Sequence, residues 1–265
     1  MPTTDDHLAL SDLNYAEALR EMSRRSAGAV HDEDGLLLFA GGHALPVLIN
    51  GAMRTDAAVA PADVLARARA FFAARQRGFS IIVRAHADAD LQEAAAAAGL
   101  LAYGAAPGMV LDHRLADAVP PGGVRLRRVA SLADATEFAS VMDAAYESLG
   151  MPRGVAAVQF ARLEALVAPH IVAVLADVDG VPSAGALTIV THGVAGVYWV
   201  GTRPQARGRG LAELCTRAVG NAGFDLGARV AALQASPMGE PVYRRMGYVE
   251  VTRYPTLVQF EPPAA

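Results

Sequence analysis

The sequence contains no lysine, and all 23 of its basic residues are arginines. Against 27 acidic residues, the arginines leave a formal net charge of −4. A nucleic-acid-binding domain usually carries a strong basic excess, so we expect no nucleic-acid partner. The absence of lysine also excludes acetylation of any lysine side chain of the protein itself.

The sequence also has little cysteine, no long apolar run and no basic N-terminal segment. Cys215 is the single cysteine, so a disulfide within the chain is excluded and a reducing compartment is favoured. No uncharged apolar run reaches the length of a membrane span. Residues 1–7 are acidic and do not lead into an apolar segment, so we expect no signal peptide. Together these features predict a cytoplasmic protein without a membrane partner.

The histidines and the cysteine give no sign of a metal site. Cys215 falls in a helical pattern of apolar residues and is expected to be a small core residue, with a nucleophilic role as the alternative. Four histidines lie among carboxylates without the spacing of metal ligands, so we expect no metal; they are His31, His43, His86 and His113.

The most informative feature present is a glycine-rich turn between an apolar strand and an amphipathic helix. The strand is predicted over 194–200 and the helix from Leu211, and between them stands Gln205-x-x-Gly208-x-Gly210. The glycines allow successive N–H groups to point inward at the positive end of a helix dipole. This arrangement suits a pyrophosphate. Neighbouring arginines either contact that group or remain solvated.

Two common nucleotide motifs do not fit this turn. The dinucleotide fingerprint needs a third glycine, but Gly210 is followed by Leu211, Ala212 and Glu213. The loop that binds nucleoside triphosphates needs Lys followed by Ser or Thr, which is absent here. The function of the turn therefore depends on the residues that follow it.

Downstream, a predicted strand over 230–235 precedes the segment Tyr243-Arg244-Arg245-Met246-Gly247-Tyr248. With the glycine turn, this segment resembles the Gcn5-related N-acetyltransferase (GNAT) family. The resemblance implies an α/β fold with a central mixed, mostly antiparallel sheet flanked by helices, and acetyl-coenzyme A as acyl donor. It places the cofactor against Val200, Gly201, Thr202, Gln205, Arg207, Gly208, Arg209, Gly210, Leu211, Ala212, Ser236 and Tyr243.

The resemblance also implies roles for some of these residues. The Val200 N–H is expected to bind the thioester oxygen, and Tyr243 to donate a proton or hydrogen bond to the leaving sulfur. Ser236 stands near the place where many relatives carry an asparagine that binds the cofactor arm, which leaves that contact open.

The general base is not fixed by the sequence. Many relatives use a carboxylate on the strand before the turn, but 194–200 contains none. Glu147 is our candidate, His192 is a second, and proton loss to water is a third. Tyr198 and Trp199 alternate across the strand, so one is expected to line the acceptor pocket and the other to lie in the core.

The two halves of the chain echo each other. Gly99 and Pro107 are related to Gly247 and Pro255 by a single constant offset. This offset places Ala95 opposite Tyr243, and 57–62 opposite the glycine turn. The first half is therefore predicted to be a second copy that has lost cofactor binding, with chance similarity as the alternative.

We predict two tandem GNAT-like domains, at residues 1–118 and 123–265, joined by a Pro/Gly-rich linker. Helices in the first half are expected at 13–27, 61–77 and 91–98, with Asp88 capping the last, and strands at 36–40, 45–49 and 79–83. In the second half, helices are expected at 132–147 and 155–167, and strands at 124–128, 171–177, 184–190, 194–200, 230–235 and 249–260.

The predicted function is transfer of an acetyl group from acetyl-coenzyme A to a primary amine of a small molecule by direct attack. The first half is expected to supply structure and one wall of the acceptor pocket, and the chain to be a monomer or homodimer. One alternative is an acyltransferase that uses another acyl group or acts on a protein N-terminus. Another is a non-catalytic acyl-coenzyme A-binding sensor or scaffold, which the missing strand carboxylate favours and Tyr243 disfavours.

Overall fold

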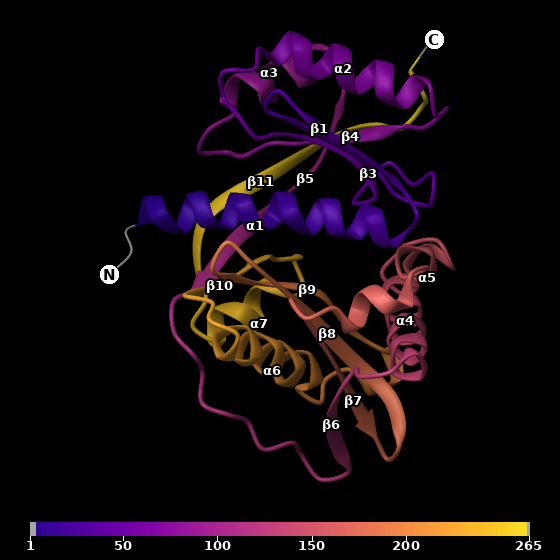
Figure 1. Cartoon of the computed structure of the whole chain (residues 1–265), viewed down its shortest axis with the longest axis vertical. Coiled ribbons are helices and arrows are strands. Elements are labelled where there is room, and N and C mark those ends of the chain that lie inside the picture. The colour runs from indigo at the N-terminus through magenta and orange to yellow at the C-terminus, as the bar shows by residue number, and fades with distance from the viewer. Residues whose placement is uncertain (1–3, 264–265) are drawn as a thin grey trace.

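The computed structural model describes residues 4–263, which form one mixed sheet with helices on both faces (Figure 1). The eleven strands of the described chain are ordered β1-β2-β3-β4-β11-β5-β10-β9-β8-β7-β6. The strands are β1 (Ala29–Glu33), β2 (Leu36–Ala40), β3 (Asn50–Arg54), β4 (Phe79–Ile82), β5 (Leu101–Leu111), β6 (Val124–Arg128), β7 (Ile171–Val178), β8 (Val181–Thr191), β9 (Val194–Thr202), β10 (Val230–Gln234) and β11 (Val249–Gln259). The helices are α1 (Thr4–Arg25), α2 (Pro61–Ala73), α3 (Ala89–Ala97), α4 (Leu132–Glu147), α5 (Val155–Gln159), η1 (Leu163–Val167), η2 (Pro204–Ala206), α6 (Leu211–Asp225) and α7 (Glu240–Arg245). The predicted α/β class with a mixed sheet is confirmed.

The last strand of each half pairs with the other half. β11, from the end of the chain, lies between β4 and β5, whereas β5 pairs with β10 of the second half. Figure 1 shows β11 running from the lower half of the molecule to the upper half beside β5. The two halves are therefore joined by an exchange of strands as well as by residues 112–123, which contain no helix or strand.

The helix α1 lies across both halves, as Figure 1 shows. Ala16 and Leu19 pack into a core cluster of the first half with Phe39, whereas Ala18 packs into a cluster of the second half with Tyr198. Burial on two sides fixes the position of this helix, because each contact removes apolar surface from water.

Hydrogen bonds from one side chain anchor α1 to the second half. The buried Asn14 side chain donates to the carbonyl oxygen of Ile189 at 3.1 Å and accepts from the Tyr198 hydroxyl at 2.7 Å. The first half thereby supplies a wall that covers β9.

Several boundaries differ from the sequence predictions. α1 begins at Thr4, well before residue 13, because its acidic first turn, with Asp5 and Asp6, suits the positive end of the helix. The strand predicted at 45–49 is wrong: this segment contains Pro46, which cannot donate to a ladder, and Leu48 has a φ of 68°. β3 begins only at Asn50.

Two further elements differ from their predictions. The helix predicted at 155–167 is divided into α5 and η1, because the Arg162 N–H donates to the Arg25 carbonyl at the end of α1 instead of continuing the helix. The strand β1 was not predicted, since its sequence is polar and its burial is slight. Among the described residues, no helix combines the length and the apolar character that a membrane span requires.

Candidate functional site

The strands β9 and β10 separate at one end of the sheet. They pair in parallel from Val194 to Gly196 with Val230 to Ala232, and both then continue without pairing to each other. On the other edge of β9 the register with β8 shifts, so that Trp199 and Val200 lie opposite a single residue, and Trp199 has a φ of 51°. A bulge of this kind bends a strand and releases backbone groups from the ladder. The result is an opening in the sheet.

Two cavities meet at this opening. The first, which we name the turn cavity, has a volume of about 360 Å³, and the second, the aromatic cavity, has about 170 Å³. Val200, Ser236 and Tyr243 line both. The turn cavity is also lined by Ala145, Leu149, Gly201, Thr202, Ala206, Arg207, Gly208, Gly210, Leu211, Ala212, Glu213, Met238, Gly239, Val242 and Arg245. The aromatic cavity is also lined by Tyr15, Leu19, Met22, Leu48, Ile49, Tyr146, Val197, Tyr198, Trp199, Leu233 and Gln234.

The cavities approach the opening from opposite faces of the sheet. Ala206 and Leu211, which line the turn cavity and not the aromatic cavity, belong to the core cluster under α6. Tyr146 and Trp199, at the aromatic cavity, pack against the cluster under α4. A molecule in each cavity would therefore meet the other at Val200 and Tyr243.

The glycine turn has the conformation that an anion site needs. Gly208 and Gly210 have φ values of 75° and 72°, and a Cβ at either position would meet no atom within 4 Å. Glycine is therefore required by the backbone conformation and not by lack of space. Gly210 is the N-cap of α6 and offers no capping side chain, so the N–H groups of the first turn remain available to a ligand.

The arginines around the turn differ in their positions. Arg207 lines the turn cavity, but its guanidinium bonds to the Ser148 hydroxyl and to the Ala145 carbonyl at 3.4 Å. Arg245 lines the same cavity, is exposed, and has no ion pair within residues 4–263. In the sequence Arg245 stood out only as part of the second motif, and its place at the cavity comes from the short helix α7.

Tyr243 lies where the two cavities join. It is 8% exposed, and Gly239 makes room for its ring, since a Cβ there would approach the ring to 2.7 Å. Burial raises the pKa of the Tyr243 phenol to about 12. The hydroxyl is therefore protonated at neutral pH and can act as a hydrogen-bond or proton donor.

The structure brings most of the predicted binding residues to the turn cavity. Ten line it, namely Val200, Gly201, Thr202, Arg207, Gly208, Gly210, Leu211, Ala212, Ser236 and Tyr243. Gln205 and Arg209 are exposed and do not line either cavity. Both Tyr198 and Trp199 line the aromatic cavity, so the expectation that only one would do so was wrong.

The two candidates for a general base lie elsewhere. Glu147 lines neither cavity, and its carboxylate accepts from Arg153 Nε at 3.0 Å. His192 lies in the turn between β8 and β9, at the opposite end of β9 from Val200. His192 precedes the first residue of β9, whereas Val200 lies near its last residue. His192 is therefore too far from the opening to act as the general base.

The buried phenols predict a loss of stability in alkali. Burial raises the pKa of Tyr15, Tyr146, Tyr198, Tyr243, Tyr248 and Tyr254 in the folded chain. The unfolded state then loses phenolic protons first, so the free energy of unfolding falls as pH rises above about 10. The expected slope is about 1.4 kcal/mol per pH unit for each tyrosine that ionises only on unfolding. Circular dichroism and tyrosinate absorbance should change together; tyrosinate from all six in a folded chain would contradict this.

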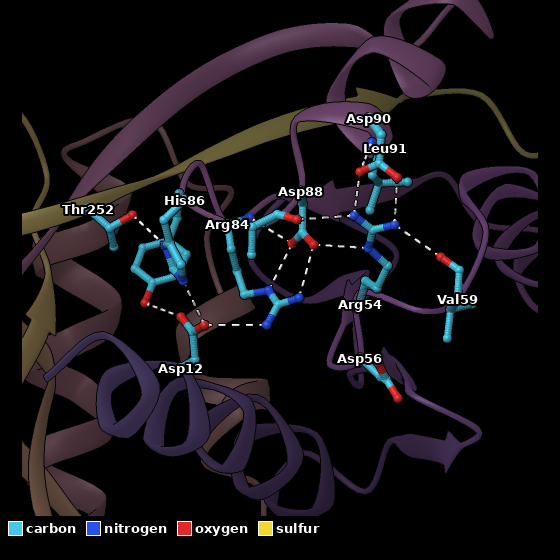
Figure 2. A network of polar contacts seen from close by, with 12 residues as sticks. Asp12, Arg54, Asp56, Val59, Arg84, His86, Asp88, Asp90, Leu91 and Thr252 are labelled. Atoms are coloured by element: carbon cyan, nitrogen blue, oxygen red, sulfur yellow. Dashed lines mark hydrogen bonds and ion pairs between the residues drawn. The ribbon is translucent and has the colours of Figure 1, made fainter. Parts of the chain in front are cut away.

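The matching place in the first half is occupied by an ion-pair network (Figure 2). β3 pairs in parallel with β4 up to Met53 and Ile82, as β9 does with β10. Beyond that pair, the buried Asp88 accepts from Arg54 Nε at 2.9 Å and from Arg84 Nε at 2.8 Å. Asp88 was predicted to cap α3, but its side chain makes no capping bond because both its oxygens bind these arginines.

The turn of the first half also lacks the features of a phosphate site. α2 begins at Pro61, so the segment that matches 203–210 is 55–60 and not 57–62, as the constant offset had placed it. The segment 55–60 is shorter and contains no glycine. The network reaches α1 through Arg84 and His86, which contact the Asp12 carboxylate at 3.4 and 3.1 Å.

Asp88→Asn is expected to lower the free energy of unfolding by about 3 kcal/mol, because it leaves two arginines without their buried counter-charge. Chemical denaturation measures this change. Asp56→Asn is the matched control, since Asp56 is exposed and its side chain bonds only to the Ala58 N–H among the described contacts. Equal losses in the two variants would show that the network does not stabilise the fold.

No protein-family model matches the sequence, and a comparison with curated proteins finds no match. Solved structures match across most of the chain. A GCN5-related N-acetyltransferase from Kribbella flavida is 23% identical with a TM-score of 0.69, over 92% of this chain and 95% of that one. A GCN5-related N-acetyltransferase from Sphaerobacter thermophilus is 15% identical with a TM-score of 0.63, over 100% and 95%. A tandem GNAT protein from the clavulanic acid biosynthesis pathway is 17% identical with a TM-score of 0.60, over 100% and 98%.

These similarities extend through both halves. The chain therefore has the fold of the GCN5-related N-acetyltransferases, as the glycine turn and the Tyr243 segment predicted, in the tandem arrangement that the constant offset between the halves predicted.

Proposed function

We propose that the protein transfers an acyl group from acetyl-coenzyme A to a primary amine of a small molecule. The observation that carries this proposal is the meeting of two cavities, from opposite faces of the sheet, at Val200, Ser236 and Tyr243. Direct transfer needs the donor and the acceptor to reach one carbon from different sides. A cavity of about 170 Å³ on the acceptor side favours a small molecule over a protein N-terminus.

The turn cavity suits the coenzyme. Its pyrophosphate would lie against the N–H groups of residues 208–212, at the positive end of the fifteen-residue helix α6. The exposed Arg245 adds a positive charge without an ion-pair partner among the described residues. The arm of the coenzyme would follow β9 through Thr202 and Gly201 to the opening.

The chemistry would take place at the junction of the cavities. The amine nitrogen attacks the thioester carbon, while the N–H of Val200, which lies in the bulge of β9, stabilises the oxyanion. The bond between carbon and sulfur then breaks, and the Tyr243 hydroxyl gives its proton to the leaving thiolate. The nitrogen gives up its proton to water, and Tyr243 recovers one from solvent.

A thiol-release assay with a set of primary amines tests this function. We expect free coenzyme A to appear only when protein, acetyl-coenzyme A and an amine are present together, and mass spectrometry to detect the acetylated amine. Tight acetyl-coenzyme A binding without release for any amine would instead support a non-catalytic sensor or scaffold.

A further inference from the structure

The walls of the aromatic cavity carry no formal charge. Of its fourteen lining residues, none is Asp, Glu, Lys, Arg or His. Tyr15, Tyr146, Tyr198 and Trp199 supply aromatic surface, and Gln234 and Ser236 supply neutral polar groups. An ammonium or carboxylate group bound here would lose its hydration without gaining a counter-ion, which is costly.

No group in this cavity can act as a base at neutral pH. Its titratable residues are four tyrosines, and burial raises the pKa of each above its usual value. An ordinary alkylamine has a pKa near about 10 and is mostly protonated at pH 7. Such an acceptor would need a base before it could attack.

Six carboxylates on the helices that form the walls are engaged with other groups. On α1, Glu21 pairs with Arg25 at 3.3 Å. On α4, Asp143 accepts from the Gly154 N–H at 2.9 Å, and Glu147 pairs with Arg153. The carboxylates Asp12 and Glu17 of α1 bind Arg84 and Arg20. On α7, Glu240 pairs with Arg244.

The volume of the cavity fits one aromatic ring. A cavity of about 150 Å³ lined by apolar side chains accommodates benzene, and this one has about 170 Å³. The rings of Tyr146 and Trp199 pack edge to face at 5.0 Å, with an angle of 62° between their planes. Such walls favour a flat ring, which packs against aromatic side chains in offset or edge-to-face geometry.

Two wall residues have strained backbones. Trp199 has a φ of 51° within β9, and Leu48 has a φ of 68° in the loop before β3. Residues held in this region persist where the surrounding structure imposes them, often at ligand sites. Leu48 is 58% exposed although it lines the cavity, so it lies at the mouth.

From the uncharged walls, the missing base and the size of the cavity, we propose that the acceptor is a small, uncharged arylamine; this rests on the proposed transferase function. The lone pair of an arylamine is delocalised into its ring, so the amine is neutral at pH 7 and needs no base to attack. After the bond between nitrogen and the acyl carbon forms, the cationic nitrogen is acidic and releases its proton to water. The bond between carbon and sulfur breaks, and the thiolate receives the Tyr243 proton.

Three probes of similar size test the proposal in a thiol-release assay with acetyl-coenzyme A. They are aniline, benzylamine as the charged alkylamine, and 4-aminobenzoate as the charged arylamine. At pH 7 we expect kcat/KM for benzylamine to be about 100-fold below that for aniline, in line with its small neutral fraction. It should rise about tenfold per pH unit up to pH 9, while the value for aniline stays flat. A higher kcat/KM for benzylamine or 4-aminobenzoate than for aniline at pH 7 would overturn the proposal.

A charge placed at the mouth tests the location of the acceptor. Leu48→Glu is expected to lower the dissociation constant of benzylamine relative to that of aniline by about tenfold, because the new carboxylate attracts the ammonium group. Leu13→Glu is the control, since Leu13 is a 48% exposed residue of α1 that does not line the cavity. It should leave the ratio unchanged. An unchanged ratio in Leu48→Glu would contradict an acceptor site in the aromatic cavity.

Failure of this proposal can be told from failure of the transferase function. If acetyl-coenzyme A does not bind, or no amine is acetylated, the transferase function itself is wrong. If alkylamines are acetylated and aniline is not, only the acceptor class is wrong. If aniline inhibits a longer acyl-coenzyme A competitively without being acylated, the aromatic cavity holds the acyl chain, and the acceptor assignment is overturned.

Discussion

Gly208→Glu is expected to weaken acetyl-coenzyme A binding by at least about 100-fold. Gly208 has a φ of 75°, which a side chain adopts only with strain. The new carboxylate would also lie beside the pyrophosphate that we place at the start of α6, and a like-charge contact costs several kcal/mol. Calorimetric titration measures the dissociation constant directly.

A matched variant at a second glycine separates the effect of backbone strain on cofactor binding from the effect of the added charge. Gly180 has a φ of 82° in the turn between β7 and β8, a Cβ there would meet no atom within 4 Å, and it lines neither cavity. Gly180→Glu should therefore cost similar stability and leave binding unchanged. Wild-type affinity in Gly208→Glu would remove the glycine turn from the cofactor site.

Tyr243→Phe is expected to lower kcat by about 100-fold or more while the dissociation constant of acetyl-coenzyme A stays within about threefold. The variant keeps the ring and its packing but removes the only proton donor that we assign to the leaving sulfur, and a general acid typically contributes 10²–10⁴-fold. Single-turnover kinetics on the cofactor-saturated protein separates this step from binding.

Tyr248→Phe is the matched control for this change. Tyr248 is 3% exposed and its ring lies 5.9 Å from that of Tyr243, but it lines neither cavity. Tyr248→Phe tests the effect of removing a buried tyrosine hydroxyl that lies away from the junction of the cavities. A kcat in Tyr243→Phe equal to that in Tyr248→Phe would exclude Tyr243 from the chemistry.

The half of the site that the sequence predicted is the half encoded locally. The glycine turn and the start of α6 lie within one stretch of strand, turn and helix, so local patterns predict their arrangement. Tyr243 follows in α7, after β10, and was placed by the second motif. The position of Arg245 follows from that of Tyr243, because both lie in α7 and line the turn cavity.

The aromatic cavity depends on contacts across the length of the chain. Tyr15 and Met22 come from α1 and Leu48 from the loop before β3, whereas Tyr146 and Trp199 come from the second half. The first half was expected to supply one wall, but no periodicity shows which of its residues meet β9. The positions of these residues in the aromatic cavity depend on the packing of α1 against both halves of the chain.

Asp88 is the N-cap residue of α3, but its missing side-chain cap and the unpredicted strand exchange have the same origin. An Asp at the start of a helix usually caps it with its side chain. The Asp88 side chain instead forms ion pairs with the buried Arg54 and Arg84. β11 was predicted as a strand and β5 was not, and nothing within either segment specifies which half it joins. The boundaries at 1–118 and 123–265 remain a prediction about the repeated sequence units.

A crystal structure of the protein with acetyl-coenzyme A tests the central claim most directly. We expect one coenzyme per chain, with its pyrophosphate against residues 208–212 and its thioester between the Val200 N–H and the Tyr243 hydroxyl. We expect none beside Arg54 and Asp88 in the first half. A coenzyme bound in the first half, or one whose thioester lies away from the junction of the two cavities, would contradict this assignment.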